Sequence, residues 1–275
     1  MEYLFSPLTI RGHQLKNRIF STGHMTVMLE NGNPSDRMVA YHQARAAGGA
    51  ALIIVEAARA HPSGVSSRPS IAAFHDDCIP GYRRIAEACH QHGCKVFGQL
   101  AHPGREMSEA LDGTFAVAHA PSQVPNERFH VMPREMPIAM IAEIVAGFGA
   151  AAGRMKRAGL DGVEVIASQG YLLSQFLNPA VNRRTDQYGG DRDGRLRVVR
   201  EVLAAVRQGA GDDMVVGLRI SGDAMEHDGL EADEVVEIAA ALDGAGLLRY
   251  IHVTAGPSPR LCRSIPIVPP IPFTH

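Results

Sequence analysis

Two polar side chains that could hold a ligand lie inside apolar segments of this sequence. Gln99 lies within KVFGQLAH, and Arg219 lies within MVVGLRIS. A buried glutamine amide needs partners and can both donate and accept hydrogen bonds. A buried arginine is very costly without an anionic partner. Contact with a ligand would satisfy both residues. The structural alternative for Gln99 is a hydrogen bond to a neighbouring strand, and for Arg219 it is a salt bridge to Glu56 or Glu164.

A third candidate follows an apolar strand in the segment 165-VIASQGYLLSQFLNPAVNRRTDQYGG-190, which continues into a long polar excursion. Tyr171 stands just after Gln169 and Gly170. A phenol can donate a proton to a carbon that has just accepted a hydride, or it can hold a substrate oxygen. Tyr171 is therefore the best candidate for proton delivery or substrate contact. The alternative is a tyrosine at the rim that packs against the loop.

These side chains must be positioned by alternating strands and helices. The strand-like runs are nearly continuous in apolar residues, which indicates strands buried on both faces, as in a parallel sheet. They cover residues 17–23, 51–58, 95–102, 162–168, 214–221 and 250–256. Apolar residues at helical spacing predict helices between them. These helices cover residues 35–48, 79–93, 138–158 and 235–242, and Gly159 is expected to cap the third.

Two architectures fit this order, an open doubly wound sheet and an eight-fold barrel. The open sheet should carry a GxGxxG fingerprint after an early strand, and none of these strands is followed by one. In a barrel, chemistry collects at the carboxyl ends of the strands, where the polar residues above also stand. The sequence therefore predicts an α/β protein with a TIM-type (β/α)8 barrel.

The barrel is expected to be incomplete, because about six strand–helix units occupy the chain up to residue 256. The segment 265–275 is rich in proline and is a poor strand or helix. We therefore expect one barrel domain over residues 1–275 that lacks its last strand–helix units.

Composition favours a cytoplasmic protein with a small-molecule substrate, and leaves a homo-oligomer open. The chain of 275 residues has a formal net charge of -2, so no basic field points to nucleic acid or to a membrane surface. The 4 cysteines form no CxxC pair, which favours buried, reduced thiols. Cys89, His90, His92 and Cys94 lie close together, but a helix end would point them in different directions, so no metal site is expected.

From Phe5 to about Gly256 the chain resembles the Old Yellow Enzyme family of FMN-dependent oxidoreductases. The resemblance lies in 5-FSPLTIRG-12, 15-LKNRIFSTG-23, 98-GQLAHPGR-105, 170-GYLLSQFLNPAVNRRTDQYGG-190 and 217-GLRIS-221. It implies that Gln99 binds the pyrimidine edge of the flavin and that Arg219 stabilises negative charge on the reduced ring. It further implies flavin contacts from Thr22, Gly23, His24 and Met25 after the first strand, and from Ala57 at the end of the second.

The sequence also departs from the better-known ene reductases of that family. These enzymes place a pair of histidine or histidine/asparagine donors where Ile166 and Gln169 stand here. The pattern is more similar to the 2,4-dienoyl-CoA reductases, and Gly23-His24 is more similar to the amine dehydrogenases and N-demethylases. Met25 stands where some relatives carry a flavin-linking cysteine, which implies non-covalent FMN. An iron–sulfur cluster is expected only if the native chain continues past residue 275.

The resemblance thus implies an FMN-dependent oxidoreductase with Tyr171 and Gln169 as its catalytic residues. Hydride would pass between NAD(P)H or an N-methylated amine and the flavin, and then to a second acceptor. The alternative is a non-catalytic or weakly flavin-binding fragment of a longer flavoenzyme. A barrel lyase or aldolase without flavin is less favoured, because no strand carries an obvious Schiff-base lysine.

Overall fold

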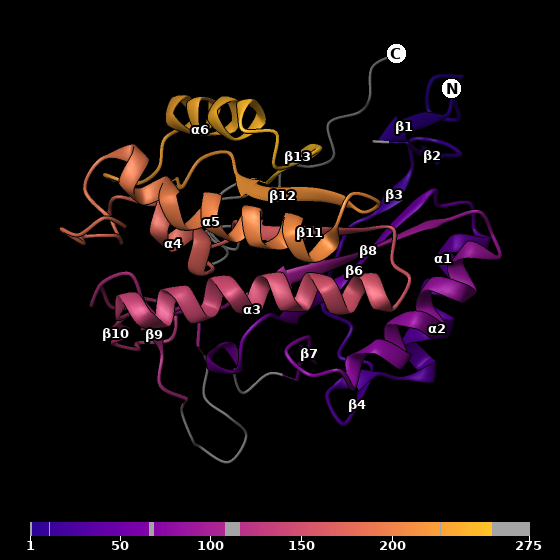
Figure 1. Ribbon diagram of the computed structural model, residues 1–275, viewed down its shortest axis with the longest axis horizontal. Helices are drawn as coiled ribbons and strands as arrows, with labels where there is room; N and C mark the ends of the chain where they lie inside the picture. Colours follow the sequence, from indigo (N-terminus) through magenta and orange to yellow (C-terminus); the bar gives the residue numbers. More distant parts are fainter. Residues whose placement is uncertain (1, 11, 66–68, 108–115, 226, 255–275) are drawn as a thin grey trace, which may run out of the picture.

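A curled parallel sheet forms the centre of the molecule (Figure 1). The computed structural model describes residues 2–10, 12–65, 69–107, 116–225 and 227–254. The strands follow one another as β13-β12-β11-β8-β6-β3, with β7 (Ile71–Ala72) beside β6. Their bounds are β3 Phe20–Ser21, β6 Leu52–Arg59, β8 Lys95–Ala101, β11 Gly162–Ala167, β12 Val215–Ser221 and β13 Tyr250–Thr254. Within the described residues, β3 and β13 remain the two open edges of this sheet.

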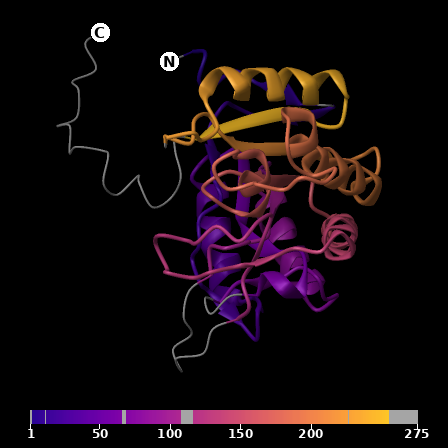
Figure 2. The ribbon, with the colours of Figure 1, turned by 90° about the vertical axis from the view of Figure 1, so that its left-hand side faces the viewer.

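Helices alternate with these strands and cover the outer face of the sheet, and α3 and α5 lie side by side (Figures 1 and 2). Their bounds are α1 Asp36–Ala47, α2 Cys78–His90, α3 Ile138–Arg157, α4 Leu172–Leu177, α5 Arg192–Ala210 and α6 Ala232–Gly244, with a 3-10 turn at Pro62–Gly64. Because the strands are parallel and helices connect them, the predicted TIM-type α/β architecture is confirmed, as an incomplete barrel.

Short strand pairs lie outside the central sheet. The hairpin β1 (Leu8–Ile10) and β2 (His13–Leu15) is antiparallel, as is the pair β4 (Leu29–Glu30) and β5 (Asn33–Pro34). The pair β9 (His119–Ala120) and β10 (Arg134–Glu135) is parallel. Leu15 packs with the inward-facing residues at the amino-terminal ends of the central strands, so the first hairpin lies at that end of the sheet.

Alternation along the strands divides the core into two parts. The outward side chains, such as Ile53, Val96 and Val163, pack with the helices in one large hydrophobic cluster. The inward side chains near the amino-terminal ends form a second cluster with Leu52 and Phe97. Further along, the inward positions become polar, so the polar part of the inner face lies toward the carboxyl ends of the strands.

Helix α3 and helix α5 approach each other closely through glycines. A Cβ added to Gly209 would lie 2.1 Å from the carbonyl oxygen of Gly149, so only glycine fits there. Among the described helices, α3 is the one long and apolar enough to cross a membrane by length and composition, but it packs in the core here. Gly159 follows α3 with φ +83°, which confirms the predicted left-handed glycine cap.

Three stretches differ from the sequence-based expectations. Strand β3 spans only Phe20–Ser21 of the predicted 17–23, and the Asn17 side chain instead bonds the Gly49 carbonyl and the Ile19 amide. Helix α4 begins immediately after Tyr171, where the sequence predicted a polar loop, and helix α5 was not expected. Predicted strand residues 255–256 lie outside the described residues.

A β-bulge in β6 sets the direction of the residues near its end. Ile54 pairs with Phe97 on β8, but the next paired residues are Ala57 and Gln99, so β6 has one extra residue between them. Because such an insertion reverses the alternation, Ala57 comes to face the same side as Gln99. Glu56 is fully buried and accepts hydrogen bonds from the amide and hydroxyl of Thr26.

Candidate functional site

The predicted strand residues of the site come together on the inner face of the sheet. Gln99 pairs with Ala57 on one side and with Glu164 on the other, while Arg219 on β12 pairs with Ile166 on β11. Glu164 and Ile166 are two residues apart on one strand, so Gln99 and Arg219 share a face. The structure thus brings these two side chains to one surface, separated by two strand spacings of roughly 5 Å each.

The Gln99 amide is held in one orientation by a buried carboxylate. Gln99 is 2% exposed, and its Nε2 donates to Glu164 Oε1 over 2.6 Å. An ionised carboxylate can only accept, so the amide must present its nitrogen to Glu164 and its oxygen elsewhere. A Cβ added to Gly23 would lie 2.9 Å from Gln99 Oε1, so glycine allows the amide and the loop after β3 to approach. The structural hydrogen bond is therefore present, and contact with a ligand stays a prediction.

Glu164 also receives hydrogen bonds from the last strand of the sheet. The Tyr250 hydroxyl donates to Glu164 Oε2 over 3.1 Å, and His252 Nδ1 lies 3.1 Å from the same oxygen. Burial, and then the Glu164 carboxylate, raises the pKa of Tyr250 well above its usual value, so this phenol stays protonated. Sequence reasoning considered Glu164 only as a partner for Arg219, whereas it joins β8, β11 and β13.

Arg219 has no ion pair with either acid considered from the sequence. Glu164 is occupied by Gln99 and the β13 side chains, and Glu56 binds Thr26 instead. The Nε atom of Arg219 is buried and has no hydrogen-bond partner among the described residues. A guanidinium with a buried unpaired nitrogen on a half-buried side chain is a ready donor for an acceptor group on the inner face.

The loop after β3 carries four of the predicted contacts, at different depths. Thr22 and His24 are exposed, while Gly23 and Met25 are partly buried. His24 Nε2 makes a short hydrogen bond with the Tyr41 hydroxyl of α1. That bond joins the loop to the first helix, so at least one predicted flavin contact has a structural partner as well.

The end of β11 has strained backbone where the catalytic residues were predicted. Gln169 has φ +60° and Gly170 has φ +76°. The backbone N–H of Gln169 donates to Ser221 Oγ over 3.1 Å. A non-glycine residue in the left-handed region is uncommon, and such residues occur often at functional sites. Tyr171 follows as the half-buried N-cap residue of α4, and its backbone amide donates to the Ser168 carbonyl. This turn brings Tyr171 to the carboxyl end of the sheet.

Two buried residues beside Tyr171 were not among the predicted site residues. Arg59 ends β6 and is 5% exposed, and His102 follows β8 and is 1% exposed. His102 Nδ1 accepts from the Gly104 amide, so Nε2 carries the proton and donates to Ser63 Oγ. Burial, then nearby Arg59, lowers the pKa of His102 to about 3, so the imidazole is neutral near pH 7. Arg59 could have been found, because it stands two residues after Ala57 in a strand.

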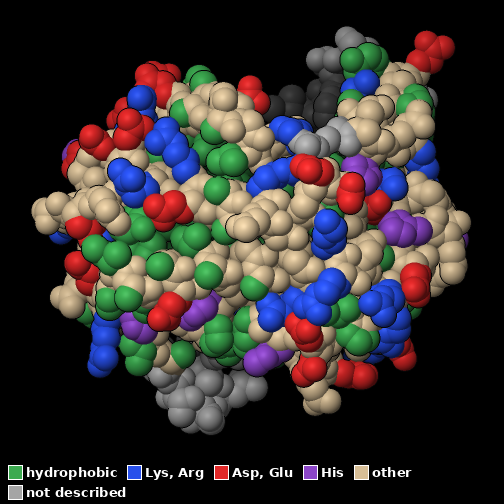
Figure 3. Space-filling model, in the orientation of Figure 1, with side chains coloured by type: hydrophobic (Ala, Val, Ile, Leu, Met, Phe, Trp, Pro, Cys, Tyr) green, Lys and Arg blue, Asp and Glu red, His purple; other side chains and the backbone are tan. Residues whose placement is uncertain are grey.

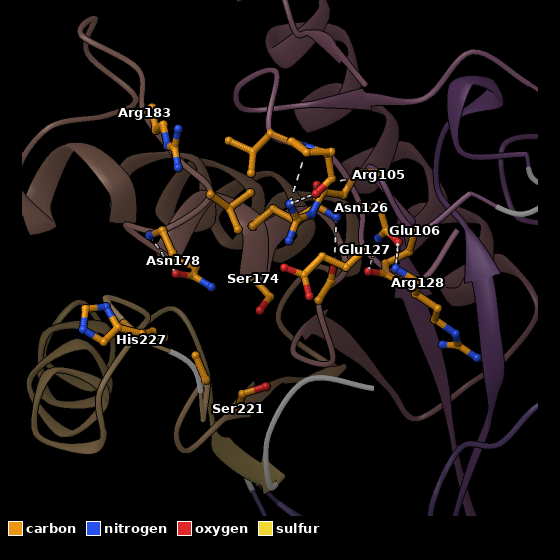
Figure 4. A pocket seen from close by; sticks show the side chains of 18 residues that line it. Arg105, Glu106, Asn126, Glu127, Arg128, Ser174, Asn178, Arg183, Ser221 and His227 are labelled. Carbon is orange, nitrogen blue, oxygen red and sulfur yellow. Dashed lines mark hydrogen bonds between the residues drawn. The ribbon is translucent and has the colours of Figure 1, made fainter. Parts of the chain in front are cut away.

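A cavity of about 480 Å³ opens beside these strand ends (Figure 4). It lies between residues 105–106, residues 124–128, helix α4 and the end of β12, and Gly170 and Ser221 are among its lining residues. Arg105 crosses one wall and donates to the carbonyls of Val124 and Pro125. None of the predicted flavin contacts lines this cavity, so it is not the inner-face surface that holds Gln99 and Arg219.

The described cysteines are buried free thiols, and side chains of both charges are mixed on the face shown in Figure 3. Cys78, Cys89 and Cys94 are free and buried, and burial raises the pKa of these thiols to about 11, 12 and 11. No group of three or more His, Cys, Asp or Glu within the described residues could hold a metal ion. Basic and acidic side chains are interspersed on the face in Figure 3. Cys262 lies outside the described residues.

The sequence and the fold both match known proteins. Residues 3–255 match the profile of the NADH:flavin oxidoreductase / NADH oxidase family. A metal reductase of Desulforamulus reducens is 40% identical over 93% of this chain and 38% of its own length. An N,N-dimethylglycine/sarcosine dehydrogenase of Chromohalobacter salexigens is 35% identical over 99% of this chain and 40% of its own. The chain therefore spans about two fifths of these relatives.

A solved structure shows the same architecture. Morphinone reductase in complex with tetrahydroNAD superposes with a TM-score of 0.79 at 31% identity, covering 91% of this chain and 73% of that one. With a family profile that matches nearly all of the described chain, the conclusion is direct: this chain belongs to the NADH:flavin oxidoreductase / NADH oxidase family, the FMN-dependent oxidoreductases on a TIM-type barrel.

Proposed function

We propose that this chain binds FMN non-covalently across the inner face of its sheet, between Gln99 and Arg219. The observation that carries the proposal is the buried, unpartnered Nε of Arg219 on the same face as the Gln99 amide. Gln99 donates through its side-chain nitrogen to Glu164, so its side-chain oxygen remains to accept from an N–H on the pyrimidine edge of the flavin. Gly23 leaves room beside that amide, which suits the close approach of a flat ring.

FMN, when bound, supplies the hydride chemistry, while the protein supplies position and electrostatics. Arg219 places a fixed positive charge where the reduced ring gains negative charge, which favours reduction. The Gly23 and Ala57 positions keep the walls of the site free of bulky side chains. Tyr171 is proposed to hold a substrate oxygen or deliver a proton, and Gln169 to orient the substrate beside it.

The proposed reaction is hydride transfer between NAD(P)H or an N-methylated amine and the flavin, and then to a second acceptor. The family description supports the nicotinamide, and the dehydrogenase of N,N-dimethylglycine and sarcosine supports the amine. Ile166 stands on β11 next to Arg219 and cannot donate a hydrogen bond. Polarisation of an unsaturated ketone from this position is therefore not part of the proposal.

Anaerobic reduction of the FMN-loaded chain tests this function. The visible flavin absorbance is expected to bleach on addition of NADH, NADPH or an N-methylated amine such as N,N-dimethylglycine, and to return with an electron acceptor. The reductant that bleaches fastest identifies the natural donor. If FMN is bound but none of these reductants bleaches it, the proposed reaction is wrong.

A second candidate function is a flavin-binding fragment without turnover. The observation that favours it is the open sheet, since β3 and β13 do not pair with each other within the described residues. In TIM barrels the phosphate of a ligand is often held by the loops after strands seven and eight. Weak FMN binding without reduction would support this candidate.

We also propose a cytoplasmic location, since the free cysteines Cys78, Cys89 and Cys94 are buried and their thiols have raised pKa values. A small-molecule substrate without nucleic-acid or membrane partners fits the mixed surface charge in Figure 3. Sedimentation of the purified chain measures whether it forms a homo-oligomer.

A further inference from the structure

Arg59 is a buried cation that the proposed flavin contacts do not use. The side chain is 5% exposed, and its Nε has no hydrogen-bond partner among the described residues. No carboxylate of the described residues forms an ion pair with it, and the phenol of Tyr171 is near enough to act on its charge. A buried guanidinium is strongly unfavourable unless an anion pairs with it. The described residues therefore supply no anionic partner for Arg59, so a bound ligand could supply one.

Arg59 places this charge at the carboxyl ends of the strands, which we call the mouth of the site. Ala57 pairs with Gln99 and Arg59 pairs with Ala101, so Ala57 and Arg59 lie on one face of β6. Arg59 is thus roughly 7 Å further toward the carboxyl ends of the strands than the proposed flavin contacts. Burial lowers the pKa of Arg59 and the neighbouring Tyr171 raises it, while His102 beside it stays neutral.

The chemistry of the guanidinium selects the ligand. Its planar set of N–H donors matches the two oxygens of a carboxylate, and such charge-assisted pairs are stronger than neutral hydrogen bonds. Because Arg59 is almost completely buried, we infer that its partner is a small terminal group. The Tyr171 hydroxyl beside it can donate to the same anion.

We propose that Arg59, with Tyr171 beside it, binds the carboxylate of a small organic-acid substrate at the mouth of the site. This inference rests on the proposed function and narrows its substrate class to small amines that carry a carboxylate. The carboxylate would fix one end of the substrate at Arg59, so that the other end extends toward the level of Gln99 and Arg219.

Equilibrium binding with a matched pair of probes tests the inference. N,N-dimethylglycine and N,N-dimethylglycinamide share the amine and differ in the charge of the carboxyl end. Their dissociation constants for the FMN-loaded chain are measured by calorimetry and by the change in the flavin spectrum. We expect the acid to bind at least about tenfold more tightly than the amide, from about 1.5 kcal/mol or more for a charge-assisted pair. Equal affinity of the two probes for the unaltered chain overturns the inference without any variant.

Variants then assign the effect to one side chain. Arg59→Met should lower the affinity for the acid to that for the amide, and Arg59→Lys should retain part of it, because lysine keeps the charge but not the planar set of donors. Arg197→Met, at an exposed position of α5, is the control and should bind both probes as the unaltered chain does. An Arg59→Met chain that folds, retains FMN and still prefers the acid overturns the inference.

The same titration separates this inference from the proposed function. Calorimetry of the flavin-free chain reports carboxylate binding without the cofactor. If FMN does not bind but the acid still binds in an Arg59-dependent way, the proposed function fails and the carboxylate site stands. If FMN binds and is reduced while the acid and amide bind alike, the proposed function stands and the carboxylate site fails.

Discussion

Replacement of Arg219 by alanine should slow reduction of the bound flavin by about 10²- to 10³-fold, the loss typical of one preorganised charge-stabilising donor. Within the described residues the Nε of Arg219 is buried and unpaired and neither Glu56 nor Glu164 uses the side chain, so its removal breaks no ion pair of this part of the fold. The effect should therefore fall on flavin affinity and reduction rather than on folding. Stopped-flow reduction under anaerobic conditions, with an FMN titration, measures both quantities.

Two further variants make the Arg219 prediction specific. Arg219→Lys keeps the charge and should recover part of the rate but not all of it, because an ammonium lacks the planar set of donors. Arg249→Ala removes an exposed arginine just before β13 and should leave both measurements unchanged. If Arg219→Ala binds and reduces flavin as well as the unaltered chain, the assignment of Arg219 to the ring is wrong.

Replacement of Glu164 by leucine should lower the free energy of unfolding by on the order of 3 kcal/mol, because it leaves buried donors of Gln99 and Tyr250 without an acceptor. The Gln99 amide would also be free to turn, so flavin affinity should fall with stability. Urea unfolding of the flavin-free chain measures the first effect, and an FMN titration measures the second.

Glutamine at the same position separates charge from hydrogen bonding. Glu164→Gln keeps the volume and one acceptor oxygen, and should cost about 1 kcal/mol. If the leucine variant is as stable as the unaltered chain, Glu164 does not have the joining role that its contacts indicate. If the leucine variant is destabilised but binds FMN normally, the orientation of Gln99 does not matter for the flavin.

The parallel sheet could be predicted because its strands are buried on both faces and therefore nearly continuous in apolar residues. Strands β6, β8, β11 and β12 lie within a few residues of the predicted runs. Helix α5 was not expected, although Leu196, Val199, Leu203 and Val206 are buried at helical spacing. Its valines favour strands by intrinsic preference, and packing against α3 decides in favour of the helix.

The direction of side chains near the end of β6 could not be read from alternation. Strict alternation from Ile54 would place Glu56 on the inner face and Ala57 on the outer face. The bulge between Ile54 and Ala57 reverses this, so Ala57 joins Gln99 and Glu56 binds Thr26. A local insertion of this kind depends on pairing with β8, which periodicity within one strand does not contain.

The Gln99 and Arg219 predictions likewise separate what residue type shows from what strand pairing decides. Residue type alone required partners for both, and it correctly named a neighbouring strand as one partner for Gln99. It gave a salt bridge to Glu56 or Glu164 as the alternative for Arg219, and the described structure contains neither ion pair. Which acid binds which donor depends on how three strands align, since Glu164 lies opposite Gln99 but two residues away from the partner of Arg219.

A crystal structure of this chain grown with FMN tests the central claim most directly. We predict that the flavin ring lies on the inner face of the sheet, with its pyrimidine edge at the Gln99 amide oxygen and the Arg219 guanidinium beside it, and with Gln99 still bonded to Glu164. A ring bound elsewhere, or one in contact with neither Gln99 nor Arg219, would contradict the account.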